Sequence, residues 1–122
     1  MQYLEEVAVI PARDKDILRE VRQAIQRVLP GATVYLYGSG ARGTREPDSD
    51  LDLLILTDAR VSRDEETAVA EAVYELELTR GVVISTVQYE RAEWEAPLMR
   101  ATPFWNRVDA EAVRLRNRRR RG

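Results

Sequence analysis

The chain has 122 residues, 44% of them hydrophobic, and a formal net charge of −2 at pH 7. This length and composition suit one domain with a modest core, and the small net charge gives no general attraction to nucleic acid. The absence of cysteine excludes disulfides and thiolate metal sites, and the absence of histidine leaves carboxylates as general bases. Because no apolar run reaches the length of a membrane span and the N-terminus lacks the basic start of a signal peptide, we expect a cytoplasmic protein.

The first half of the chain predicts a helix followed by two strands. Residues 1–12 are ambiguous, since they suit either a helical turn or a docking strand. Apolar residues then recur at helical spacing over residues 14–29 and stop at Pro30-Gly31. Strands are expected at Thr33–Tyr37 and Leu51–Thr57. The second of these is apolar on both faces, which is typical of a central strand covered by helices.

The second half predicts a further helix and strand, followed by shorter helices. Residues 62–65 form a capping-box sequence that begins a helix, and Gly81 is its natural end. A third strand is expected at Val82–Val87, with short helices at Glu90–Ala96 and from Pro103. Together the elements predict an α/β (α+β) fold, with a small mixed sheet and helices packed on it.

Two aspartates mark the start of the second strand. Residues i and i+2 of a strand face the same side, so Asp50 and Asp52 are expected to stand side by side. Two carboxylates so close are unfavourable unless a cation lies between them. Mg²⁺ is typically held by one or two carboxylates together with the phosphates of a substrate. The pair therefore predicts a magnesium site.

The turn before the aspartates has the composition of a phosphate-binding loop. Gly38 and Gly40 allow the backbone to turn sharply, so that main-chain N–H groups can meet phosphate oxygens. Ser39 adds a hydroxyl, and Arg42 and Arg45 add positive charge. Arg42 is the first candidate for a phosphate clamp and Arg45 the second, although both also suit an ordinary surface.

The residues of this stretch also partly match three other patterns. A dinucleotide-binding glycine pattern begins at Gly38, but residues 44–50 are too few for the helix which that fold needs. A calcium loop starting at Asp48 requires glycine and glutamate where the chain has Leu53 and Ala59. A solvated polar loop stays open as the third alternative, although paired aspartates are unusual at a strand.

The order Gly38-Ser39, then Asp50-x-Asp52, resembles the signature of the DNA polymerase beta-like nucleotidyltransferases. Its spacing and the small size most resemble the minimal nucleotidyltransferase (MNT) group. The resemblance implies a polymerase beta-like palm fold, with Asp50 and Asp52 as catalytic metal ligands and Gly38 and Ser39 as nucleotide-binding residues. It implies ATP as substrate, Mg²⁺ as cofactor, and a HEPN-domain ribonuclease toxin as the partner that receives AMP on a hydroxyl.

The chain departs from the family pattern in one respect. The resemblance implies a third carboxylate on the strand after the second helix, but residues 82–88 contain none. Glu77 precedes that strand and Glu90 follows it, and neither is convincingly in register. The alternative function is therefore a catalytically weak or inactive nucleotide-binding module that neutralises a partner toxin by direct binding.

Two further features have two interpretations each. Trp94, Phe104 and Trp105 suit the core or a partner surface, and less readily a base-stacking platform. Arg114–Arg121 is arginine-rich, and suits either a solvated end or a contact with RNA, phosphate or an acidic partner. We expect residues 1–115 to form the single domain and residues 116–122 to be a disordered tail.

Overall fold

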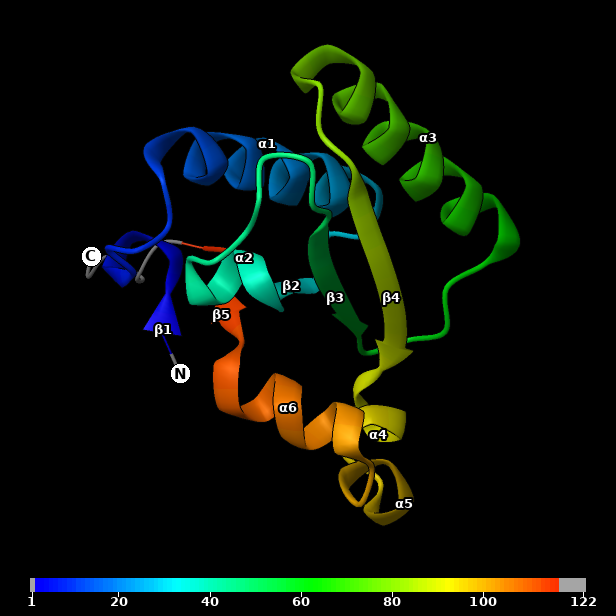
Figure 1. Ribbon diagram of the computed structural model, residues 1–122. Helices are drawn as coiled ribbons and strands as arrows, with labels where there is room; N and C mark the ends of the chain where they lie inside the picture. Colours follow the sequence, from blue (N-terminus) through cyan, green and yellow to red (C-terminus); the bar gives the residue numbers. More distant parts are fainter. Residues whose placement is uncertain (1, 117–122) are drawn as a thin grey trace, which may run out of the picture.

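A five-stranded mixed sheet in the order β1-β5-β2-β3-β4 is the framework of the fold (Figure 1). The computed structural model describes residues 2–116. Strands β3 and β4 are parallel, as are β1 and β5, whereas β2 is antiparallel to both of its neighbours. In chain order the elements are β1 (Gln2–Tyr3), η1 (Leu4–Glu6), α1 (Ala12–Val28), β2 (Thr33–Tyr37), α2 (Ser39–Arg42), β3 (Leu51–Thr57), α3 (Arg63–Arg80), β4 (Ile84–Glu90), α4 (Arg91–Trp94), α5 (Pro97–Arg100), α6 (Pro103–Glu111) and β5 (Val113–Arg114).

Helices cover both faces of the sheet, which confirms the expected central position of β3. Leu53 and Ile55 belong to the main core with the buried stripe of α1 and with Val69 of α3. Leu54 and Leu56 point the other way, into a second cluster formed with α4 and α6. In Figure 1, α1 and α3 lie above the sheet and α4, α5 and α6 below it. Asp52 shares the face of Leu54, so it lies on the α6 side.

The ends of α3 follow the sequence prediction. Ser62 Oγ accepts a hydrogen bond from Glu65 N at 3.1 Å, and Ser62 N donates to Glu65 Oε1 at 2.9 Å. This capping box is worth about 1 kcal/mol of helix stability. Gly81 ends the helix with a positive φ of 63°, which glycine adopts without steric cost.

The third predicted strand lies later in the chain than expected. It was predicted at Val82–Val87, and it forms at Ile84–Glu90. Pairing with β3 sets its bounds, because the register runs from Leu51 opposite Ile84 to Thr57 opposite Glu90. The strand therefore takes its length from its parallel neighbour rather than from the local run of apolar residues.

The arginine-rich end begins inside the fold. The interpretation of residues 114–121 as a solvated end includes Arg114. In the structure Arg114 lies in β5 and pairs with Tyr35 of β2. Leu115 is buried, and its N–H donates to the carbonyl of Val34 at 2.9 Å. Apart from Arg116, the proposed tail lies outside the described residues. Within residues 2–116, no helix is long and apolar enough to cross a membrane.

Candidate active site

The glycine turn and Asp52 meet because β2 and β3 are paired. Tyr37, the last residue of β2, lies opposite Asp52, so Gly38 follows directly beside that aspartate. Gly38 has φ 76° and ψ −159°, a backbone region that is essentially restricted to glycine. A Cβ atom at this position would lie 2.7 Å from Asp52 Oδ2. Glycine is therefore required here both by the backbone and by the carboxylate packed against it.

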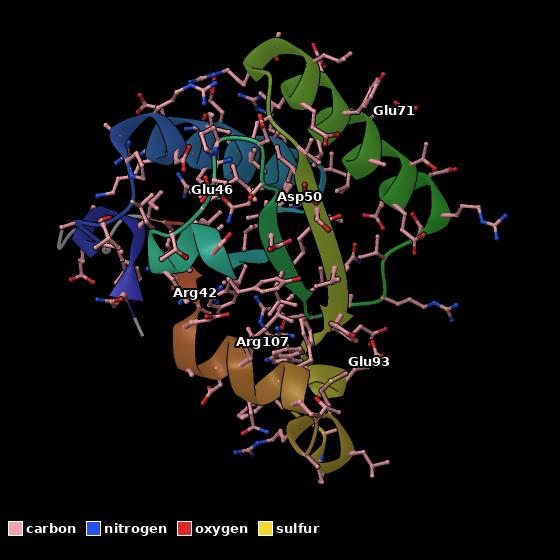
Figure 2. The ribbon with its side chains drawn as sticks, in the orientation of Figure 1. Arg42, Glu46, Asp50, Glu71, Glu93 and Arg107 are labelled. Atoms are coloured by element: carbon pink, nitrogen blue, oxygen red, sulfur yellow. The ribbon has the colours of Figure 1, made fainter. Side chains whose placement is uncertain are left out.

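The two aspartates form a cluster of like charge. Asp50 is exposed immediately before β3, and Asp52 is partly buried within the strand. Burial is the main cause that raises the pKa of Asp52, and the neighbouring carboxylates of Asp50 and Glu111 raise it further. Arg107 and Arg42 oppose this rise in pKa. Figure 2 shows Asp50 at the start of β3, Arg42 on α2 and Arg107 on α6.

A third carboxylate reaches the glycine turn from the end of α6. Glu111 Oε1 accepts a hydrogen bond from the Gly38 N–H at 3.1 Å, and Glu111 Oε2 accepts one from Arg42 Nη1 at 2.6 Å. The side chain of Glu111 is 14% exposed, whereas that of Arg42 is 50% exposed. The sequence alone does not indicate Glu111 or Arg107 as site residues, because nothing in the local sequence of α6 connects that helix to the glycine turn.

Arg45, the second candidate for a phosphate clamp, is occupied elsewhere. Its Nε and Nη2 donate to the two carboxylate oxygens of Asp14 at 3.2 and 2.7 Å, and Nη1 donates to the carbonyl of Ser49 at 2.8 Å. The side chains of Arg45 and Asp14 are only 8% and 7% exposed. This buried pair ties the N-terminal part of α1 to the loop that leads to Asp50. The structure therefore leaves Arg42 as the better placed of the two arginines.

The aromatic residues pack on the sheet rather than forming an open platform. Trp94 contacts Phe104 at 5.8 Å between ring centroids and Trp105 at 6.3 Å, and Phe104 contacts Tyr37 edge-on at 5.5 Å. All four residues belong to the cluster over Leu54 and Leu56. Core packing is thus the role the structure supports. The contact between Phe104 and Tyr37 also holds α6 against the strand that ends in the glycine turn.

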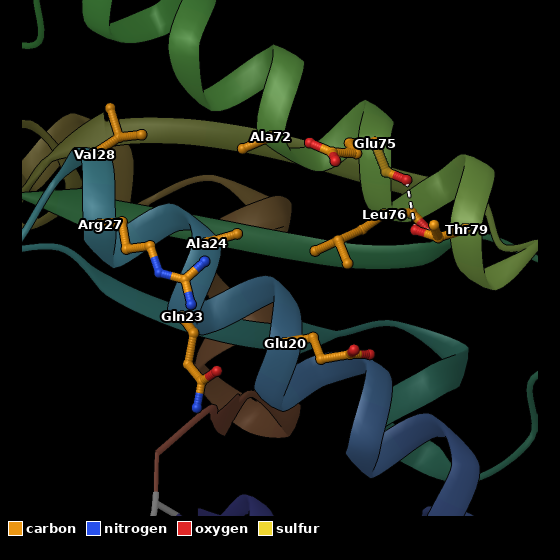
Figure 3. A pocket seen from close by; sticks show the side chains of 9 residues that line it. All are labelled: Glu20, Gln23, Ala24, Arg27, Val28, Ala72, Glu75, Leu76 and Thr79. Carbon is orange, nitrogen blue, oxygen red and sulfur yellow. Dashed lines mark hydrogen bonds between the residues drawn. The ribbon is translucent and has the colours of Figure 1, made fainter.

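A cavity of about 420 Å³ lies between α1 and α3 (Figure 3). Ala24 and Leu76 lie along it, and the charged side chains of Glu20, Arg27 and Glu75 surround it. It is on the opposite face of the sheet from Asp52, because α1 and α3 pack on the Leu53 side. Since no residue of the glycine turn or aspartate pair lines it, this cavity is separate from the candidate active site.

Comparison with known proteins identifies the family of this site. A family model described as a nucleotidyltransferase domain matches residues 18–109, a range that contains the glycine turn and both aspartates. The chain belongs to this family. It is also 33% identical over 88 residues to poly(A) RNA polymerase GLD2-A of Xenopus laevis. That alignment covers 70% of this chain but only 17% of the relative, so the chain spans less than a fifth of that protein.

Solved structures confirm the nucleotidyltransferase fold. The chain is similar to a crystal structure of a toxin–antitoxin with AMP-PNP, with a TM-score of 0.56, 17% identity, and coverage of 88% of this chain and 75% of that one. It is also similar to a mutant of the MntA-HpeT toxin–antitoxin, with a TM-score of 0.56, 15% identity, and coverage of 83% and 73%. At these identities the similarity concerns the fold.

No carboxylate of β4 lies beside Asp52. The residue beside Asp52 on that strand is Ser85. Glu77 Oε2 instead accepts a hydrogen bond from Ile84 N at 2.9 Å, and Glu90 pairs with Thr57 at the far end of β3. Both glutamates therefore have positions away from the aspartate pair, as their poor register in the sequence indicated.

The carboxylates of Asp50 and Asp52 fit one divalent ion whose remaining ligands come from a nucleotide and water. Asp50 and Asp52 supply the oxygen ligands that Mg²⁺ prefers, and their mutual repulsion is relieved by a cation. Within residues 2–116, no group of three or more Asp, Glu, His or Cys side chains is arranged to hold a metal by itself. Phosphate oxygens and water are then needed to complete the coordination, as is usual for Mg²⁺ in nucleotide-binding sites.

Proposed function

We propose that this protein is a Mg²⁺-dependent nucleotidyltransferase that transfers AMP from ATP to a hydroxyl of a protein partner. The observation that carries the proposal is the Asp52 carboxylate packed against Gly38, with Asp50 beside it. This arrangement would bring a cation site next to a turn whose Gly38 N–H already donates to a carboxylate, that of Glu111. Membership of the nucleotidyltransferase family supports the same reaction class.

Each residue of the site has a proposed role. Asp50 and Asp52 would hold Mg²⁺, which neutralises part of the triphosphate charge when bound. Ser39 and Gly40 begin α2, so their N–H groups have no acceptor within the helix and are available to phosphate oxygens. Arg42 would add a charged donor to the same oxygens.

The transfer needs one bond to form and one to break. The acceptor oxygen forms a bond to the α-phosphorus, and the bond from that phosphorus to the oxygen bridging the α- and β-phosphates breaks. Pyrophosphate leaves with the electron pair, and the hydroxyl proton passes to water. The chain contributes by fixing the triphosphate between the glycine turn and the aspartates, so that the α-phosphorus is presented to the acceptor.

A protein acceptor is proposed from the fold relatives. Both crystal structures named above are described as toxin–antitoxin structures, one of them with AMP-PNP. By that likeness the partner is a toxin, and we propose a HEPN-domain ribonuclease that is modified on a hydroxyl. The similarity to a poly(A) RNA polymerase makes RNA the other acceptor that a transfer assay has to distinguish.

A second candidate function is supported by the composition of β4. Because Ser85 stands beside Asp52 on β4 and no carboxylate of that strand is near the aspartate pair, the site would have one ligand fewer for a second metal ion. The protein would then bind a nucleotide weakly or not at all, and would neutralise its partner by contact. This candidate predicts a stable complex without AMP on the partner.

The transfer assay compares ATP labelled at the α-phosphate with ATP labelled at the γ-phosphate. The protein is incubated with Mg²⁺ and a soluble cell extract that supplies acceptors. We expect incorporation of the α-label only, sensitive to protease and resistant to ribonuclease. Asp50→Asn should abolish it. Asp48→Asn is the matched control, because Asp48 is exposed in the same loop and the substitution makes the same change of charge.

Each alternative has its own result in this assay. If treatment with ribonuclease removes the incorporated label, the acceptor is RNA. Absence of transfer by the wild type, with a stable partner complex, would favour the masking function. Undiminished transfer by Asp50→Asn would refute the proposed metal site.

A further inference from the structure

Glu111 occupies the position at which the proposed function requires a phosphate. Its two carboxylate oxygens accept hydrogen bonds from the Gly38 N–H and from Arg42 Nη1, at 3.1 and 2.6 Å. A backbone N–H of a glycine turn and an arginine are the donors expected for a phosphate oxygen. The turn thus holds an anion in this structure, and the anion belongs to the protein itself.

Another carboxylate lies near Glu111. The charges of Asp50 and Glu111 both raise the pKa of Asp52, whose carboxylate lies beside Gly38. The side chain of Glu111 is only 14% exposed, so water does little to screen it. Its position therefore depends on Arg42 and the Gly38 N–H, which are the donors that a nucleotide would also need.

Among the residues that the structure describes, Glu111 binds the donors of the glycine turn and is not part of a metal-binding group. Both of its oxygens already accept hydrogen bonds at the glycine turn. In the part of the chain that the structure describes, Glu111 does not join Asp50 and Asp52 in a group arranged to hold a metal. Glu111 thus does not take the place of the third metal-binding carboxylate that the family resemblance implies.

We propose that Glu111 is an internal competitor of the nucleotide, which binds fully only when this carboxylate leaves Gly38 and Arg42. The inference rests on the proposed function and adds to it a residue that sets nucleotide affinity. Glu111 contacts the turn through its side-chain oxygens, so a change of its side-chain rotamer is enough to release Gly38 and Arg42. Arg42 is half exposed and would then be free to bind phosphate.

Competition of this kind has a defined effect on affinity. The apparent dissociation constant equals the intrinsic one divided by the fraction of molecules in which Glu111 is displaced. An ion pair with one half-exposed partner is weak, and repulsion between the carboxylate and the phosphate adds to its effect on affinity. We therefore expect roughly three- to tenfold tighter nucleotide binding when the charge of Glu111 is removed.

The test is Glu111→Gln, which keeps the shape of the side chain and removes its charge. Dissociation constants for ATP and for inorganic tripolyphosphate, each with Mg²⁺, are measured by calorimetry. Tripolyphosphate lacks the nucleoside, so tighter binding of both probes locates the effect at the phosphate position. Asp109→Asn is the matched control, since Asp109 is an exposed residue of the same helix and has no hydrogen bond to Gly38 or Arg42. An unfolding curve for each variant confirms that it is folded.

The possible results separate this inference from the proposed function. Tighter binding of both probes to Glu111→Gln, with Asp109→Asn unchanged, supports the competitor. If the wild type binds the probes and Glu111→Gln binds them equally well or more weakly, the competitor role is overturned. The proposed nucleotide site is not affected by that result. Weaker binding in particular would mean that Glu111 positions Arg42 for the ligand. If neither the wild type nor Glu111→Gln binds either probe, both the inference and the proposed function fail.

Discussion

Gly38→Ala is expected to lower the stability of the protein and to disturb the proposed metal site. The added Cβ would lie 2.7 Å from Asp52 Oδ2, a distance that real Cβ contacts essentially never show. The contact to Asp52 Cβ, in contrast, would be an ordinary 3.7 Å. The aspartate carboxylate must therefore rotate or the turn must shift, and either change displaces the ligand from its position beside Asp50.

The cost has two parts that the structure allows us to separate. Backbone strain comes first, because φ 76° with ψ −159° is essentially a glycine conformation and costs about 2 kcal/mol for alanine. Displacement of the Asp52 carboxylate adds about 1 kcal/mol, as for a side chain forced from its rotamer. The predicted loss of about 3 kcal/mol is smaller than the usual stability of a domain, so the variant should remain folded.

Gly81→Ala is the control for backbone strain. Gly81 also has a positive φ, of 63°, but no atom lies within 4 Å of the position of its added Cβ. It should lose about 1 kcal/mol and bind Mg²⁺ and ATP normally. A second control combines Gly38→Ala with Asp52→Ala, which removes the clashing oxygen. The double variant should be about 1 kcal/mol more stable than the sum of the single effects predicts.

Urea unfolding followed by tryptophan fluorescence measures these differences, because Trp94 and Trp105 both lie in the cluster over the Asp52 face of the sheet. Two results would refute the reasoning. One is a Gly38→Ala variant that loses no more stability than Gly81→Ala. The other is strict additivity of Gly38→Ala and Asp52→Ala, which would mean that the alanine does not meet the carboxylate.

Two further predictions concern charges. Asp14→Asn breaks the buried pair with Arg45 and should cost about 3 kcal/mol, whereas Asp16→Asn, in an exposed ion pair, should cost less than about 0.5 kcal/mol in the same urea experiment. Equal effects would mean that the buried pair has no special importance. Because the pKa of Asp52 is raised by burial and by Asp50, stability falls as the pH rises from the ordinary aspartate pKa to the raised one, and the full cost of ionising Asp52 applies above it. Asp50→Asn should therefore stabilise the metal-free protein at pH 7, by about 0.5 kcal/mol after screening by solvent, and a lower unfolding midpoint would contradict this.

The sequence predicts those features of the fold that depend on residues close together in the chain. The glycine turn, the two strands around it and the capping box at Ser62 each depend on residues near one another in the chain. The structure has β2 at Thr33–Tyr37 and β3 at Leu51–Thr57, as predicted. The family could also be identified in this way, since its signature lies within the segment from Gly38 to Asp52.

Features that depend on distant parts of the chain could not be predicted. Glu111 reaches Gly38 only because α6 packs across the sheet, and no local pattern indicates this contact. The two-residue strand β5 is too short to have a periodicity, and the arginines around it suggested a tail. The pairing of Arg45 could not be predicted either, because its buried partner, Asp14, lies 31 residues earlier in the chain, in α1.

The most direct test of the central claim is a calorimetric titration of ATP into the purified protein, with Mg²⁺ and with EDTA, beside Asp50→Asn. Binding that needs Mg²⁺ and is lost in Asp50→Asn is the result we predict, because Asp50 and Asp52 would hold the ion that the triphosphate shares. Binding that is equally strong in EDTA, or that Asp50→Asn leaves unchanged, would contradict the metal–nucleotide site. Absence of binding to the wild type would also contradict it for the isolated chain, and the masking function would then be the better account.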